Sequence, residues 1–188
     1  YKRQVYTSVM IALLVAASML IFASKYLAVV LYKNSFYSAW MVGCILIFAF
    51  VFNSLSSLIG TIYTATKKTS VLFYSTLAAA CVNIALNIIL IPCYGLYGAA
   101  FATLVSYVCV WLIRALLAKK QMEKGFIDRN SLIILVLIAF QIVIELSSLE
   151  YKMFLSFVIV LLVIAAAYKK LRNSILYDKI TTIIERRK

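Results

Sequence analysis

The residues best suited to chemistry in this sequence are amides and hydroxyls that recur within strongly apolar runs. The polar positions of two successive runs are Asn53, Ser57, Thr61, Ser75, Asn83 and Asn87. Residues four apart lie on the same side of a helix, so each run carries one polar stripe. In lipid such a stripe must face other protein or a water-filled cavity. Two interpretations stay open: tight helix packing, or a cavity that hydrogen-bonds a polar substrate such as a sugar.

Three charged residues lie within or at the ends of apolar runs. Arg114 is either an anchor that reaches the membrane surface or a phosphate-binding group, since its fork of N–H donors suits that anion. Lys25 allows the same choice between a surface anchor and a substrate contact. Glu145 is the only acid within a run, and a carboxylate there is a candidate for ion coupling. Its place near the end of the run is equally consistent with simple hydration.

Groups for covalent catalysis are missing from the sequence. It has no histidine, no phosphate-binding glycine loop and no carboxylate pair at catalytic spacing. Its four cysteines are scattered, and we interpret them as small apolar packing residues rather than metal ligands. We therefore expect a protein that is not an enzyme and that uses no metal or other cofactor.

The composition is that of an integral membrane protein. Of the 188 residues, 65% are hydrophobic and 13% are charged, and the mean hydropathy is +1.03. A soluble domain would carry about 25% charged residues. The net charge is +13, but the basic residues stand mostly between the apolar runs, so topology explains them better than a nucleic-acid partner does.

Six apolar runs, near 5–24, 39–62, 70–91, 98–117, 131–148 and 153–168, are the predicted crossings. With the first residues in the cytoplasm, six crossings leave only Lys25, Lys33 and Lys152 on the outer side. The positive-inside rule therefore predicts that both ends of this chain are cytoplasmic.

Four segments follow from these runs. We expect a four-helix bundle part over 1–118, a cytoplasmic loop over 119–130, a terminal helix pair over 131–168 and a basic amphipathic tail over 169–188. Within the first segment, Pro92 and Gly95 predict a chain reversal that makes a helical hairpin. Gly98 begins a face of small residues that favours close helix packing.

The stretch 58–107 resembles the C-terminal part of Wzx-type polysaccharide flippases, in the multidrug/oligosaccharidyl-lipid/polysaccharide exporter superfamily. The residues that carry the resemblance are Gly60, Lys67 to Thr69, Asn83 to Asn87, Leu90 to Pro92, Tyr94, Gly95, Gly98 to Ala100, Ala102, Thr103, Ser106 and Tyr107. The similarity is good over 1–120 and only topological beyond it.

The resemblance implies an all-α polytopic bundle in a bacterial inner membrane. Such proteins move undecaprenyl-diphosphate-linked repeat units of O-antigen or capsule between leaflets by alternating access. Their partners are the lipid-linked oligosaccharide, membrane lipids, a polysaccharide polymerase and glycosyltransferases. This chain would then be the C-terminal part of a longer transporter. Two alternatives remain: a cation-coupled multidrug exporter of the same superfamily, and a scaffold of a polysaccharide synthesis complex that transports nothing.

Overall fold

The computed structural model describes residues 2–31, 39–119, 129–147 and 149–185, and throughout these ranges the regular structure is α-helical. The helices are α1 (Lys2–Leu31), α2 (Ala39–Ala65), α3 (Thr69–Lys119), α4 (Arg129–Leu146) and α5 (Lys152–Glu185). The predicted all-α class is confirmed. Residues 120–128 of the predicted loop lie outside the described residues.

Four of these helices are long and apolar enough to cross a membrane: α1, α2, α3 and α5. Helix α4 is apolar but shorter in its apolar part, Asn130–Leu146. Because the backbone of a helix bonds to itself, a helix of apolar residues suits lipid on its outer side. The chain thus belongs to the membrane class, while the count of six crossings stays a prediction.

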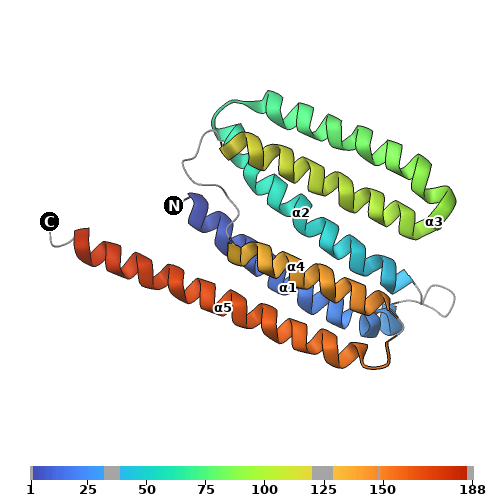
Figure 1. Cartoon of the computed structure of the whole chain (residues 1–188). Coiled ribbons are helices and arrows are strands. Elements are labelled where there is room, and N and C mark those ends of the chain that lie inside the picture. The colour runs from blue at the N-terminus through green and yellow to red at the C-terminus, as the bar shows by residue number, and fades with distance from the viewer. Residues whose placement is uncertain (1, 32–38, 120–128, 148, 186–188) are drawn as a thin grey trace.

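Helix α3 is a hairpin of two antiparallel arms, the green and yellow-green ribbons of Figure 1. The reversal lies at Gly95, whose φ of 54° and ψ of −129° are open to glycine and strained for other residues. Pro92 lies within the helix, just before the reversal. A Cβ at Gly98 would collide with the backbone carbonyl of Leu90, so the absence of a side chain lets the arms meet. The reversal predicted around Pro92 and Gly95 is therefore confirmed.

The turn between α2 and α3 is closed by the backbone itself. Lys67 takes a positive φ of 56°, and its N–H donates to the carbonyl of Thr64 while that of Lys68 donates to Tyr63. This is the pattern of a Schellman cap, which satisfies the last carbonyls of α2 and redirects the chain. The cap places the first arm of α3 alongside α2.

The helices are stacked in the order α3, α2, α1 and α5, with α4 beside α1 (Figure 1). Helix α2 packs on both α3 and α1, and the α4–α5 pair packs on α1. Fully buried side chains of α1, α2 and α4 fill the centre, among them Met10, Leu14, Leu55 and Ile138. Helix α5 runs without a break to Glu185, so the described residues of the predicted tail continue this helix. That this tail lies on a membrane surface stays a prediction.

Candidate functional site

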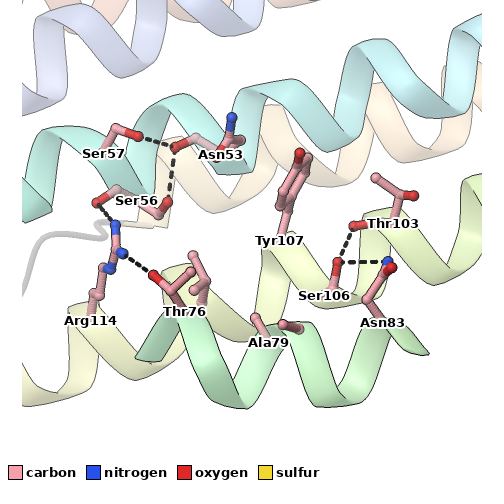
Figure 2. A pocket seen from close by; sticks show the side chains of 12 residues that line it. Asn53, Ser56, Ser57, Thr76, Ala79, Asn83, Thr103, Ser106, Tyr107 and Arg114 are labelled. Carbon is pink, nitrogen blue, oxygen red and sulfur yellow. Dashed lines mark hydrogen bonds between the residues drawn. The ribbon is translucent and has the colours of Figure 1, made fainter. Parts of the chain in front are cut away.

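A polar cleft of about 400 Å³ lies where the two arms of α3 face α2 (Figure 2). Nine of its twelve lining residues carry a hydroxyl, amide or guanidinium group, although all three helical segments are otherwise strongly apolar. The lining residues are Asn53, Ser56, Ser57, Thr76, Ala79, Ala80, Asn83, Thr103, Ser106, Tyr107, Val110 and Arg114. Polar groups at this depth of an apolar bundle are costly unless they serve a ligand or a contact.

Arg114 projects from the second arm of α3 into this cleft (Figure 2). Its Nε donates to Ser75 Oγ (3.0 Å), and its two terminal nitrogens donate to the Ser56 carbonyl (3.1 Å) and to Thr76 Oγ1 (2.9 Å). These bonds join both arms of α3 to α2. An arginine has five N–H donors, so each terminal nitrogen keeps one N–H for another acceptor. Arg114 is therefore held at the cleft by bonds to two helices, while its role as an anchor at the membrane surface or as a phosphate-binding group stays a prediction.

Gly60 on α2 lies next to the Arg114 guanidinium. A Cβ built there would lie 3.4 Å from a terminal nitrogen of Arg114 and 3.4 Å from Leu72. The Gly60 backbone is buried beneath the guanidinium, and its carbonyl accepts a bond from Thr64. These distances are ordinary van der Waals contacts, so Gly60 packs at one end of the cleft without the position requiring a glycine.

A chain of amides and hydroxyls follows the arms of α3 away from Arg114. Asn87 Nδ2 donates to Asn83 Oδ1 (2.9 Å), and Asn83 Nδ2 donates to Ser106 Oγ (3.3 Å). Ser106 in turn donates to the Thr103 carbonyl (2.8 Å). Within the described part of the chain, the buried Oδ1 of Asn87 accepts no hydrogen bond. The chain thus links the arms and still ends in an unused acceptor.

The wall formed by α2 carries Asn53, Ser56 and Ser57 (Figure 2). Both hydroxyls donate to the Asn53 backbone carbonyl, at 2.9 Å and 3.0 Å. No described residue hydrogen-bonds the side-chain amide of Asn53. That amide and the Arg114 guanidinium therefore both offer unused donors to the same cleft.

The structure brings together part of the sequence-predicted set. Asn53, Ser57, Asn83 and Arg114 line the cleft, and buried Ser75 supports Arg114 from behind. Asn87 is one hydrogen bond removed from it. Ser56, Thr76 and Tyr107 also line the cleft and were not predicted from the sequence. Their signal was weak, because each is a single polar residue beside a predicted stripe rather than part of one.

Two other predicted pathway residues lie elsewhere. Thr61 is exposed on α2, where its hydroxyl donates to the Leu58 carbonyl of its own helix. Lys25 is on α1, close enough to Glu145 for their charges to interact. Neither contributes to the cleft, so the structure gives no support to these two as pathway residues.

Glu145 belongs to a second polar cluster, built by α1, α4 and α5. Ser18 Oγ donates to Gln141 Oε1 (2.7 Å), and Gln141 Nε2 donates to the Ser18 carbonyl (3.0 Å) and to Ser156 Oγ (3.1 Å). Ser156 also hydrogen-bonds the Glu145 carboxylate, which is only 3% exposed, and Lys152 lies nearby. The cluster shares no residue with the cleft, and its internal bonds hold three helices together.

Comparisons with protein-family models, with curated proteins and with solved structures find no match to this chain. The geometry of the cleft is therefore the basis for a functional assignment. It offers one guanidinium and several neutral hydrogen-bonding groups in a mostly apolar surrounding, which suits a ligand with an anionic part and a hydroxyl-rich part.

Proposed function

We propose that this chain is part of a transporter that carries undecaprenyl-diphosphate-linked oligosaccharide units across the bacterial inner membrane by alternating access. The observation that carries the proposal is the unused hydrogen-bonding capacity of the cleft: the Asn53 amide and the remaining N–H groups of Arg114. In a membrane, polar groups that exceed the needs of packing are expensive and point to a ligand path.

The chemistry of the cleft matches the two parts of this substrate. A diphosphate cannot enter about 30 Å of hydrocarbon without donors that replace its water. The Arg114 N–H groups can supply such donors in the fork geometry that phosphate prefers. Amides and hydroxyls such as those of Asn83 and Ser106 can bond sugar hydroxyls as both donors and acceptors.

The order of groups along the cleft suggests how the substrate would enter. Arg114 stands near Lys119, the end of α3 that the positive-inside rule assigns to the cytoplasm. Asn83 and Ser106 lie further along the arms, toward the reversal at Gly95. A headgroup taken up from the inner leaflet would therefore meet the guanidinium first and the amides next.

Substitution of the cleft residues in the native gene tests the proposal. We expect Arg114→Ala, and separately Asn83→Leu with Asn87→Leu, to reduce surface polysaccharide at least about tenfold, the loss of about 1.4 kcal/mol of binding. Lipid-linked repeat units should accumulate on the cytoplasmic side. Arg114→Lys keeps the charge but loses the fork, so it should be intermediate.

Two matched controls lie outside the cleft: Lys68→Ala for the charge and Asn130→Leu for the amide. Both should leave export unchanged, and immunoblots of washed membranes should show all variants inserted to similar levels. Normal export by well-inserted Arg114→Ala and by the double asparagine variant would refute the transport role of the cleft. A scaffold that transports nothing should tolerate these substitutions, so the same experiment separates a transporter from a scaffold.

A further inference from the structure

Tyr107 is the only aromatic residue that lines the polar cleft in the part of the chain that the structure describes. Its ring packs against Phe50 of α2, with the ring centroids 6.3 Å apart and the ring planes inclined by 50°. No described residue hydrogen-bonds its hydroxyl. Tyr107 therefore brings an apolar ring and an unused polar group to the cleft, and helix packing uses only the ring.

The Tyr107 ring stands partway along the cleft. Arg114 follows it by two helical turns, which is about 10 Å of helix with a net rotation of only about 20°. Thr103 precedes it by one turn, with a net rotation of about 40°. Figure 2 shows Tyr107 reaching from the second arm of α3 toward α2, between Arg114 and the bonded pair of Asn83 and Ser106. The order along the cleft is thus guanidinium, aromatic ring, then amide and hydroxyl.

These groups suit different parts of a diphosphate that carries a sugar. The face of an aromatic ring carries partial negative charge, so it attracts no phosphate. The same face suits the weakly positive C–H groups that form the face of a pyranose ring. The sugar hydroxyls lie at the edge of that ring, where groups such as Asn83 and Ser106 can bond them as donors and acceptors. Aromatic rings combined with a few placed polar groups are typical of small-molecule sites.

We propose, on the basis of the transport function above, that Tyr107 is the residue by which the cleft distinguishes a sugar-bearing carrier lipid from the bare carrier diphosphate. The sugar next to the diphosphate stacks on the Tyr107 ring, and the free hydroxyl bonds the edge of that sugar. Arg114 meets the same diphosphate in both lipids, so it cannot separate them. Only the lipid that carries a sugar reaches two turns further along the cleft to Tyr107.

The competing role of Tyr107 is packing alone, because its contact with Phe50 already joins α3 to α2. A side chain that only packs the helices would affect the binding of both lipids equally. A side chain that stacks on the sugar affects only the lipid that carries one. The ratio of the two affinities therefore separates these roles, even where a variant is less stable.

Native mass spectrometry of the protein purified from the native gene tests this role, with undecaprenyl diphosphate and undecaprenyl-diphosphate-N-acetylglucosamine as probes. The wild type should bind the sugar-bearing probe at least about tenfold more tightly, a difference of about 1.4 kcal/mol. Tyr107→Leu should bind both probes equally, with the affinity for the bare probe unchanged. Tyr107→Phe keeps the ring and should keep most of the preference. Tyr97→Leu is the matched control, since Tyr97 is on the same arm and contacts Met41 outside the cleft.

Three results would overturn the role of Tyr107: no preference in the wild type, an unchanged preference in Tyr107→Leu, or an equal loss of both probes in that variant. The transport function has a separate test in Arg114→Ala, which should weaken the binding of both probes alike. A loss in Arg114→Ala together with an unchanged preference in Tyr107→Leu would leave the transport function standing without this role. A wild-type protein that binds neither probe would overturn the transport function and the role of Tyr107 together.

Discussion

Glycine-to-alanine substitutions at Gly95 and Gly98 in the α3 hairpin, and at Gly43 in α2, should have three different outcomes. At Gly95 a Cβ would meet open space, so the whole cost is backbone strain at φ 54°. Such strain costs about 1–3 kcal/mol in a non-glycine residue. At Gly98 the Cβ would collide with the Leu90 carbonyl, and backbone cannot rotate away as a flexible side chain does.

The arms of the hairpin must therefore separate in Gly98→Ala, and overpacking of this kind costs about 1–3 kcal/mol or more. Gly43 is the matched control, because it lies within α2 with nothing within 4 Å of a built Cβ. Alanine there should stabilise the helix by about 0.5–1 kcal/mol. The expected gap between Gly98→Ala and Gly43→Ala is then about 1.5–4 kcal/mol.

Two measurements test this difference in stability between the variants. Unfolding in mixed micelles, followed by circular dichroism, gives the free-energy differences. Disulfide formation between Asn83→Cys and Ser106→Cys, whose native side chains are 3.3 Å apart, reports whether the arms still meet. Replacing Cys81, Cys93 and Cys109 by alanine first keeps that reaction specific. If Gly98→Ala were as stable as Gly43→Ala and cross-linked as fast, the close approach at Leu90 would be wrong.

Two further predictions concern bonds between distant helices. Gln141→Leu removes three hydrogen bonds that join α1, α4 and α5, and at about 0.6 kcal/mol each the free energy of unfolding should fall by about 2 kcal/mol. Ser147→Ala is the control, because the Ser147 hydroxyl bonds only within α4 and its end. An equal loss of stability in both variants would show that the Gln141 network does not stabilise the bundle. Tyr6→Phe removes the oxygen that accepts a hydrogen bond from the Trp111 indole N–H (2.9 Å). The free energy of unfolding should fall by about 1–3 kcal/mol, and the tryptophan emission should shift. Unchanged emission and stability would contradict that hydrogen bond.

Hydropathy and the turn residues predict most of this fold. Each apolar run lies in a helix or in one arm of α3. The reason is that backbone polar groups in lipid must hydrogen-bond within the chain, and a helix satisfies them all. The reversal at Gly95 could also be predicted from the sequence, because proline restricts the backbone and glycine frees it locally, without any tertiary contact.

The polar stripes were less reliable, and helix geometry explains the errors. A four-residue step turns about 40° beyond a full circle, so two steps from Asn53 to Thr61 rotate the side chain by about 80°. Thr61 consequently leaves the cleft that Asn53 and Ser57 line, while Ser56 comes into it. On α3 the same drift makes Asn87 a partner of Asn83 rather than a lining residue.

Contacts between helices far apart in sequence could not be read from one helix at a time. Nothing local directs Arg114 toward Ser75 and Ser56, because this orientation requires the α3 hairpin and the Schellman cap together. The hydrogen-bond partners of Gln141 likewise come from two other helices, so its own run does not reveal them.

The two polar clusters differ in a way that separates packing from ligand binding. In the α1–α4–α5 cluster, Gln141 is fully buried and uses both its oxygen and its nitrogen on neighbouring helices. In the cleft, no described residue bonds the Asn53 amide, and beside the cleft the buried Asn87 oxygen has no partner among the described residues. A cluster that only holds helices together gains nothing from spare donors and acceptors, since each costs free energy in an apolar medium. The surplus is therefore the reason to place the ligand path between α2 and α3 and not at Glu145.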